Sequence, residues 1–305
     1  MSNIRYVWFG VIIAIFFWAS NFIAIKAISS TVSPIMAATF RFVVAAVVLM
    51  IHRTWKATSE STLKWHDFIV LLVIATLGIT IQNFSIFSAL QYTSSMNASI
   101  VTANMPLAGI LLSALLLNTH ISRFNIMGVL ISLFGVLLVI TQGNITSLRF
   151  NLGEMLMMIA LISGCLYTIL SKRWLSHVPL SQQLRWMIGI GSIQMLIVAS
   201  LVDSPFHALA ALKTQDVLLI IYMGIAGTLI AYYFWMKGSL ILGPSRVTSL
   251  FNLIPVFTLL INMVLGVEVH WVQIIGIAFV CFGVFVGNKN PLEKPLNSSN
   301  KQSIC

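Results

Sequence analysis

The chain contains little charge. Charged residues make up only 8% of its 305 residues, whereas 59% are hydrophobic, and its mean hydropathy is +0.98. A soluble domain carries about 25% charged residues, so this chain cannot cover itself with a solvated surface. The composition therefore predicts an all-α integral membrane protein that is embedded in the lipid bilayer and has it as a partner.

Groups that could perform catalysis or hold a metal are also scarce. The three cysteines, Cys165, Cys281 and Cys305, have no regular spacing, which argues against a disulfide framework and a metal site. The six histidines and most of the acids fall at the expected ends of apolar segments or between them. No HExxH, GxSxG or phosphate-loop motif occurs. We therefore expect neither an enzyme nor a cofactor; an integral membrane enzyme and a non-transporting scaffold are the disfavoured alternatives.

Long apolar runs are what the chain has in abundance. A helix needs about 20 mostly apolar residues to span a bilayer. On that basis the sequence predicts ten transmembrane helices, at about residues 7–28, 34–52, 68–90, 96–117, 124–142, 152–171, 180–202, 216–236, 245–266 and 271–288. The tail at 290–305 lacks apolar periodicity, and we expect it to be disordered.

The second half of the chain repeats landmarks of the first. Asn97 and Pro106 correspond to Arg246 and Pro255, both at an offset of 149 residues. Further pairs are Gly128 with Gly276 and Gly135 with Gly283. Five predicted helices separate equivalent landmarks, and because five is odd the second half must enter the membrane from the opposite side. We therefore expect two inverted five-helix repeats, at residues 1–145 and 146–289, an arrangement typical of secondary transporters.

Positive charge is distributed unevenly between the two ends of the predicted helices. If the N-terminus is cytoplasmic, twelve Lys and Arg residues fall on the cytoplasmic side, and only Arg149 and Lys213 fall on the other. Lys and Arg near helix ends favour the cytoplasm. The sequence therefore predicts an inner-membrane protein with both termini cytoplasmic. The same pattern explains the net charge of +10 without a nucleic-acid partner.

Neutral polar and aromatic side chains occur within the predicted helices of both halves. An amide in hydrocarbon must find hydrogen-bond partners, so these groups are expected to face the bundle interior or a wet cavity. Hydrogen bonding between helices explains any single one of them equally well. As a set they predict one central substrate-binding cavity, formed by Asn21, Asn83, Asn104, Tyr167, Tyr232 and Asn252.

Four cations and a tryptophan lie near the ends of predicted helices. Lys26 and Arg41 are expected toward the outer side, and Lys172 and Arg185 toward the inner side. Snorkelling to lipid headgroups accounts fully for Lys172. For Lys26, Arg41, Arg185 and Trp235 we expect gating or structural roles. An interfacial aromatic belt is the alternative place for Trp235.

Small residues line one face of two predicted helices. Gly128, Ser132 and Gly135 share a face of the helix at 124–142, and the helix at 271–288 has glycines at similar spacing. Small residues at such spacings let helices approach closely. We expect helix packing within the chain, with homodimer formation as the further possibility.

Five stretches match a known pattern: WASNFIAIK at Trp18–Lys26, then Phe40–Met50, Ser88–Val101, Gly224–Arg246 and Leu253–Glu268. In these stretches the chain resembles the drug/metabolite transporter superfamily, specifically its ten-span members with two EamA-like repeats. The resemblance implies a carrier for small metabolites, and it favours efflux of amino acids or related compounds. Uptake of a nucleoside, vitamin or cofactor is the alternative within transport.

Two departures from that family bear on energy coupling. The first repeat ends its fourth helix with Leu117–Thr119, without the acid that relatives often have, and Met105 and Ile254 stand where relatives often have Glu. Glu154 and Glu268 remain as peripheral candidate acids. Proton-driven carriers usually depend on a membrane-embedded acid or histidine. We therefore expect facilitated diffusion.

Overall fold

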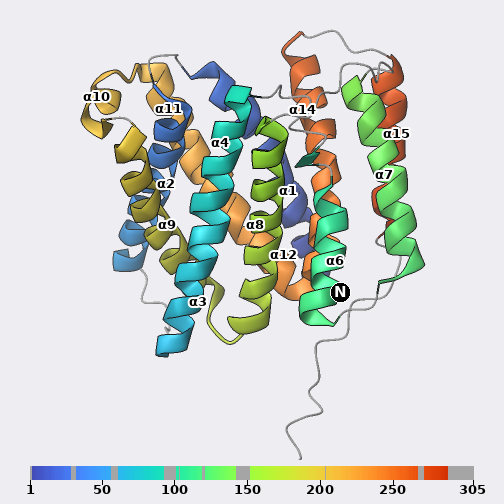
Figure 1. Cartoon of the computed structure of the whole chain (residues 1–305), viewed down its shortest axis with the longest axis horizontal. Helices are drawn as coiled ribbons and strands as arrows, with labels where there is room; N and C mark the ends of the chain where they lie inside the picture. The colour runs from blue at the N-terminus through green and yellow to red at the C-terminus, as the bar shows by residue number, and fades with distance from the viewer. Residues whose placement is uncertain are drawn as a thin grey trace, which may run out of the picture.

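The computed structural model consists of α-helices joined by short π- and 3₁₀-helical segments (Figure 1). It describes residues 2–28, 32–55, 61–92, 101–102, 104–118, 121–141, 152–202, 204–266 and 271–287. These ranges contain no β-strand. The predicted all-α fold is confirmed. Glu268 and the tail at 290–305, for which we made predictions, lie outside the described residues.

The helices of the first half are α1 (Ser2–Ala27), α2 (Pro34–Trp55), α3 (Trp65–Ala75), η1 (Thr76–Ile81), α4 (Gln82–Tyr92), α6 (Met105–Leu117) and α7 (Arg123–Thr141). Those of the second half are α8 (Leu152–Trp174), α9 (Leu180–Val202), α10 (Pro205–Ala210), α11 (Thr214–Gly224), η3 (Ile225–Ile230), α12 (Ala231–Leu242), α13 (Pro244–Ser249), η4 (Leu250–Asn252), α14 (Leu253–Val264) and α15 (Trp271–Gly287). In each half a π-helical turn therefore lies inside one continuous helix, at η1 and at η3.

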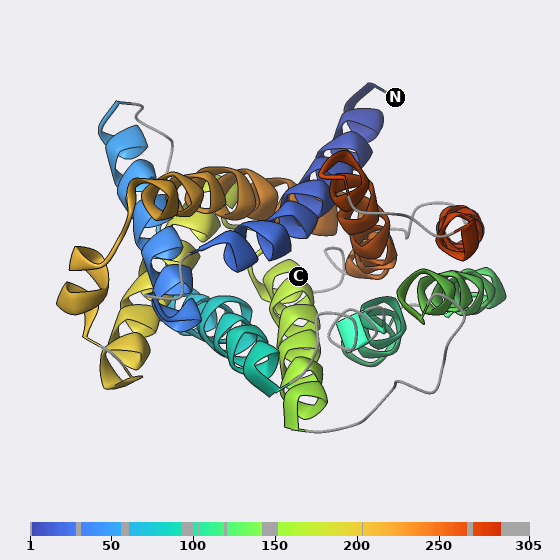
Figure 2. The ribbon, with the colours of Figure 1, turned by 90° about the horizontal axis from the view of Figure 1, so that it is seen from above.

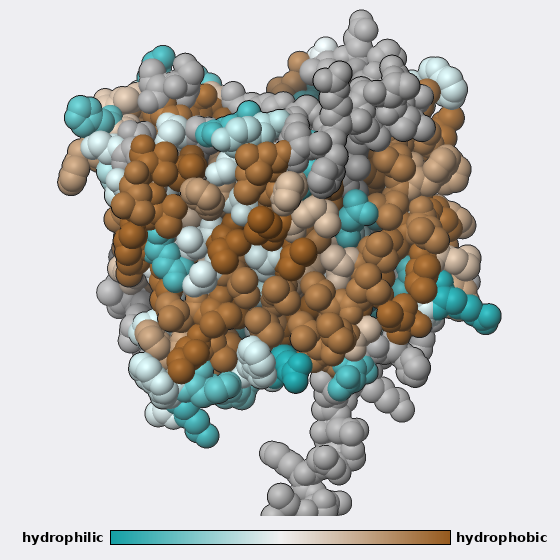
Figure 3. All heavy atoms as spheres, viewed as in Figure 1, coloured by the Kyte–Doolittle hydropathy of each residue, from teal (hydrophilic) through white to brown (hydrophobic). Residues whose placement is uncertain are grey.

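Six of these helices are long and apolar enough to cross a membrane: Ile4–Ile25, Trp65–Tyr92, Leu152–Trp174, Leu180–Val202, Thr214–Leu242 and Pro244–Val264. The shorter apolar helices are Ile35–Ile51, Met105–Leu117, Arg123–Leu138 and Trp271–Gly287. Apolar side chains cover most of the middle of the face seen in Figure 3, and hydrophilic residues gather along its lower edge. These features indicate a multi-pass membrane protein, while ten crossings stay a prediction.

Helices from the two halves pack against each other. Helix α1 packs against α12 and α14, α2 against α9, α4 against α8, and α6 against α13. Helices α7 and α15 form a pair at one side of the molecule (Figures 1 and 2). One apolar core cluster includes residues from both halves. The expected repeats at 1–145 and 146–289 thus share a core, and the boundary between them stays a prediction.

The glycines expected to permit close helix approach lie between α7 and α15. A Cβ atom on Gly128 would collide with the backbone of Gly287, and one on Gly135 would collide with the carbonyl oxygen of Gly276. The side-chain amide of Asn125 donates a 2.9 Å hydrogen bond to the carbonyl oxygen of Gly287. The small residues therefore serve packing within one chain. Homodimer formation stays a prediction.

The two π-helical turns, η1 and η3, occupy matching positions in the halves. Their first residues are 149 positions apart, which is the offset of the sequence landmarks. The helices that contain them also start alike. The backbone N–H of Lys64 donates to the carboxylate of Asp67 at 3.0 Å, and that of Lys213 donates to Asp216 at 3.0 Å. π-Helical turns are rare in proteins, and those that occur are often found at functional sites. The middle of these two helices is therefore a place to look for a functional site.

Candidate functional site

A cavity of about 90 Å³ lies where helices of the two halves meet. Its polar lining consists of Asn21, Arg41, Gln82, Asn83, Thr102 and Tyr232. Apolar and aromatic side chains from α1, α4, α8 and the region around η4 complete the wall. A single water needs about 10–15 Å³ of such space. The cavity therefore has room for several waters or for part of a small organic molecule.

Arg41 provides the positive charge of this cavity. Its side chain is only 6% exposed. The guanidinium donates a hydrogen bond to Oδ1 of Asn83, and its central carbon lies 4.9 Å from the ring centre of Phe42 and 5.8 Å from that of Phe87. Among the described residues no acidic side chain forms an ion pair with it. The predicted gating or structural residue thus forms part of the cavity wall.

Several polar atoms at the cavity are buried without a hydrogen-bond partner in the described part of the chain. They are both amide atoms of Asn21, Oε1 of Gln82 and Nε of Arg41. Buried polar atoms are normally paired, because leaving one unsatisfied costs about 1–3 kcal/mol. A ligand with donors and acceptors of its own would satisfy these atoms. This property makes the cavity the candidate functional site.

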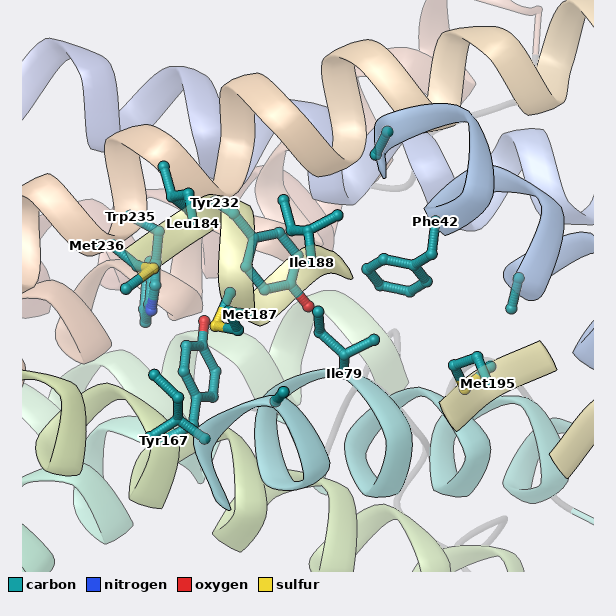
Figure 4. Close-up of a cluster of buried hydrophobic side chains, with 14 of the residues drawn as sticks. Phe42, Ile79, Tyr167, Leu184, Met187, Ile188, Met195, Tyr232, Trp235 and Met236 are labelled. Carbon is teal, nitrogen blue, oxygen red and sulfur yellow. The ribbon is translucent and has the colours of Figure 1, made fainter. Parts of the chain in front are cut away.

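Aromatic rings form one side of the cavity. The ring centre of Trp18 lies 5.8 Å from that of Tyr232 and 5.4 Å from that of Phe251. Tyr167 stacks on Tyr232, with 6.1 Å between ring centres and 30° between ring planes (Figure 4). Edge-to-face and offset-stacked pairs are the favoured aromatic arrangements. The rings therefore give the cavity a firm apolar wall.

Trp235 belongs to the layer behind that wall and not to an interfacial belt. Its side chain is 0% exposed, and its Nε1 donates a 3.0 Å hydrogen bond to Oγ1 of Thr168. Its ring centre is 5.1 Å from that of Trp18. The alternative position in the aromatic belt is therefore wrong. Trp235 therefore packs behind Trp18 at the cavity wall, and its structural role there stays a prediction.

The two π-helical turns accept hydrogen bonds from cavity residues of the opposite half. Nε1 of Trp18 donates to the carbonyl oxygen of Gly227 at 3.0 Å, and the hydroxyl of Tyr232 donates to that of Gly78 at 2.9 Å. Gly227 belongs to η3 and Gly78 to η1. Each turn is thus tied to a side chain at the cavity.

The same two glycines also make space for predicted site residues. A Cβ atom on Gly227 would collide with the side-chain amide of Asn21. A Cβ atom on Gly78 would collide with the ring of Tyr167. Only glycine lets these side chains lie directly on the helix backbone. The π-helical turns therefore shape the cavity as well as holding it.

The structure brings together Asn21, Asn83 and Tyr232 of the predicted binding set at the cavity wall. Tyr167 lies one layer back, against Tyr232. Asn252 does not line the cavity, because its side-chain amide donates to the hydroxyl of Ser132 on α7.

Asn104 does not line the cavity either. It is the residue before α6, and its neighbours Thr102 and Met105 reach the wall instead. Arg185 is half-buried on α9 and is not a lining residue. Lys26 belongs to α1, and its side chain lies outside the described residues. Only some of the predicted site residues therefore line the cavity.

Sequence reasoning missed several residues of this region. Trp18, Gln82 and Thr102 line the cavity but were not among the predicted binding residues. For Gln82 the signal was available, since it is a second amide next to Asn83 within an apolar run. Arg246, one of the twelve Lys and Arg residues that we expected on the cytoplasmic side, is only 6% exposed in α13. Its charge is therefore a weaker indicator of topology than we expected.

The arrangement defines a class of protein. A partly polar cavity between packed, apolar helices is typical of membrane transporters. Among the described residues no group of three or more His, Cys, Asp or Glu side chains is placed to hold a metal. Comparison with known proteins names the family: the model of the EamA-like transporter family matches residues 6–141 and again residues 151–288. The chain belongs to this family of the drug/metabolite transporter superfamily.

Several proteins have similar sequences, and two of the three described here are named as transporters. The uncharacterized transporter YyaM of Bacillus subtilis (strain 168) is 26% identical over 260 residues, which is 84% of this chain and 85% of that protein. An uncharacterized transporter of Archaeoglobus fulgidus is 26% identical over 289 residues, 92% of this chain and 97% of the relative. A chloroplastic WAT1-related protein of Arabidopsis thaliana is 27% identical over 92% of this chain and 69% of its own length.

A crystal structure of a protein with the same fold is also known. It superposes with a TM-score of 0.77 and covers 92% of this chain and 96% of its own. The sequence identity of that pair is 18%, so this likeness shows the fold alone.

Proposed function

We propose that the protein is a secondary transporter of the inner membrane that exports amino acids or related small metabolites by alternating access. The observation that carries this proposal is the set of buried, unpaired polar atoms of Asn21, Arg41 and Gln82 around one cavity. Polar atoms that no other group of the described protein pairs are available to a polar ligand, which can bind by forming hydrogen bonds with them. A transport site needs this property.

Alternating access is supported by the origin of the cavity wall. Asn21, Arg41 and Asn83 come from the first half, whereas Tyr232 and Phe251 come from the second. Rocking of one half against the other would therefore change access to a ligand held between them. The hydrogen bonds to Gly78 and Gly227, which cross between the halves, are the contacts that such a movement would rearrange.

We also propose the predicted topology of ten helices in two inverted repeats, with both termini cytoplasmic. It is supported by six long and four shorter apolar helices. The two separate matches of the family model support a duplication. The matching π-helical turns, 149 residues apart, do so as well. In Figure 1 the first residues of α3 and α11 lie at opposite ends of the bundle, as inversion requires.

Uptake of a nucleoside, vitamin or cofactor is the second candidate. Its support is the aromatic wall, since Trp18, Tyr232 and Phe251 all line the cavity and could stack on a planar ring. The two candidates differ in the direction of transport and in the shape of the ligand.

The test is transport by the purified full chain in proteoliposomes. Vesicles are loaded with labelled amino acids, nucleosides or vitamins, and efflux and uptake are both measured. Efflux of amino acids that falls in the Asn21→Leu variant is the expected result, because this substitution removes a polar lining group. Asn125→Leu, on the far helix pair, is the matched control. If a correctly folded protein moves no compound of the panel in either direction, the proposal is overturned.

A further inference from the structure

Arg41 holds a charge that the described residues do not balance. The guanidinium is buried at the cavity wall. It donates a hydrogen bond to the amide oxygen of Asn83 and makes cation–π contacts with two aromatic rings. No acidic side chain lines the cavity among the described residues. A buried charge without a counter-ion is strongly unfavourable. One amide oxygen and two cation–π contacts compensate only part of this cost.

The neighbours of Arg41 are also incomplete. Its own Nε, both amide atoms of Asn21 and Oε1 of Gln82 are buried without partners. All three side chains line the same cavity. The unpaired set therefore contains a guanidinium donor, a second donor from Asn21 and two amide acceptors. An anionic group beside a weak donor, such as an amine or hydroxyl, would pair with all of them.

The kind of anion follows from the charge and the shape of the site. A guanidinium presents its N–H groups in a planar fork that matches a carboxylate in two parallel hydrogen bonds. A phosphate monoester carries a charge of about −1.5 to −2 at neutral pH. The described lining offers one cation, Arg41, and no lysine. One cation balances a carboxylate but not a phosphate.

The rest of the wall indicates what the carboxylate is attached to. Phe87, Met105, Met157, Leu161 and Phe251 line the cavity with apolar surface. Methionine side chains adapt to ligands of different shape. An apolar substituent next to the carboxylate would bury against these residues and gain about 25 cal/mol per Å².

We propose that Arg41, with Asn21 and Gln82, is a carboxylate receptor, and that the transported compounds are small organic acids or zwitterions with an apolar substituent. This inference rests on the proposed function and narrows it. It places compounds with a free carboxylate among the substrates and uncharged nucleosides outside them. The donor and acceptor atoms of Asn21 and Gln82 then serve an amine or hydroxyl close to the carboxylate.

The test compares acids with their amides, which differ in the charge of one group. The full chain is placed in nanodiscs of phosphatidylcholine, and the shift in melting temperature and the binding isotherm are measured. The probes are phenylalanine and phenylalaninamide, 3-phenylpropionate and 3-phenylpropionamide, and inorganic phosphate. We expect each acid to bind at least about tenfold more tightly than its amide. We expect phosphate to bind more weakly than the acids.

Two variants assign the preference to Arg41. Arg41→Gln should remove the acid preference. Arg123→Gln should keep it, since Arg123 likewise lies against a neighbouring ring, at 5.7 Å from Phe124, but is not a cavity residue. If Arg41→Gln does not fold, the acid–amide comparison in the unaltered chain and in Arg41→Lys still decides. Equal binding of acid and amide overturns the inference, as does an acid preference that survives Arg41→Gln.

Two further measurements separate this inference from other sources of binding and from the proposed function. If phosphate binds more tightly than every acid, the cavity is a phosphoryl site. If phosphatidylglycerol nanodiscs stabilise the protein and remove the effect of added acids, the cavity is a lipid-headgroup site. Either result overturns the carboxylate assignment. Transport is then measured in proteoliposomes. Acid-selective binding without transport leaves the receptor standing and overturns the transporter. Equal transport of an acid and its amide overturns the receptor and leaves the transporter standing.

Discussion

The hydroxyl of Tyr232 donates a 2.9 Å hydrogen bond to the carbonyl oxygen of Gly78, and so joins the second half of the chain to the π-helical turn of the first. Trp18 makes the reciprocal bond to Gly227 in the π-helical turn of the second half, at 3.0 Å. Both donors line the cavity. A movement that separates the halves at the cavity must therefore stretch or exchange these bonds.

Removal of the Tyr232 hydroxyl tests the strength of this connection. In Tyr232→Phe the Gly78 carbonyl loses its side-chain partner in a buried site, which should lower the free energy of unfolding by about 1–2 kcal/mol. Tyr6→Phe is the control, because the Tyr6 side chain is 50% exposed and its ring contact with Phe234 persists. Thermal unfolding in detergent measures both. Equal melting temperatures for the two variants would contradict a structural role for the Tyr232 bond.

The lack of a side chain at Gly78 and Gly227, in the two π-helical turns, should be needed for a stable fold. In Gly227→Ala and Gly78→Ala the new methyl group would overlap Asn21 and Tyr167, and such overpacking costs about 1–3 kcal/mol. Gly189→Ala is the matched control, because no atom beyond the adjoining backbone of α9 and the two neighbouring residues lies within 4 Å of its Cβ position. That change should stabilise the protein by about 0.5–1 kcal/mol. Melting temperatures that rise in all three variants would show that the turns do not need glycine.

Two glutamines should respond in opposite ways to replacement by methionine. Oε1 of Gln82 has no partner in the described chain, so Gln82→Met should leave stability unchanged or raise it while transport falls. The expected loss of about 1–3 kcal/mol of ligand binding raises the apparent KM by about fivefold to about a hundredfold.

Gln183 is the structural counterpart of Gln82 in this comparison. Its amide accepts from Ser171 at 2.8 Å and donates to Leu175 and Val178 at 2.7 and 2.8 Å. Gln183→Met should therefore cost at least about 2 kcal/mol of stability. If Gln82→Met destabilises the fold as much as Gln183→Met does, the binding role of Gln82 is rejected.

The starts of α3 and α11 should lie on opposite sides of the membrane. Single cysteines are introduced as Lys64→Cys and Lys213→Cys after Cys165, Cys281 and Cys305 have been replaced by serine. An impermeant maleimide should label residue 213 in intact cells, and residue 64 only after the membrane is opened. Labelling of both from the same side would rule out the inverted arrangement of the halves.

Energy coupling is tested through Glu154. Its side chain is buried on α8 but does not line the cavity. We expect facilitated diffusion, with transport that continues without an imposed pH difference and changes little when a protonophore is added. Glu154→Gln should then keep this behaviour. Uphill accumulation driven by a proton gradient, and lost in Glu154→Gln, would instead identify a proton-coupled carrier.

Much of the architecture follows from local features of the sequence. Apolar runs separated by short polar segments are sufficient to predict helices, because a helix satisfies its own backbone hydrogen bonds in lipid. Asn21 and Asn83 could be selected for the same reason, as amides within such runs. The π-helical turns at η1 and η3 gave no signal beyond a glycine in each, because they lie inside continuous apolar runs in which a change of helical phase is not visible.

The composition and the apolar runs by themselves determined that this is an all-helical membrane protein, and the resemblance of five sequence stretches indicated the EamA-like type. Which polar groups share a cavity was decided only by the tertiary structure. Asn252 and Asn83 are both amides within apolar helices, yet Asn252 is paired with Ser132 while Asn83 holds Arg41 at the cavity. The physical reason is that an amide in an apolar helix must find a partner, and helix packing alone determines whether that partner is a neighbouring helix, a buried cation or a ligand.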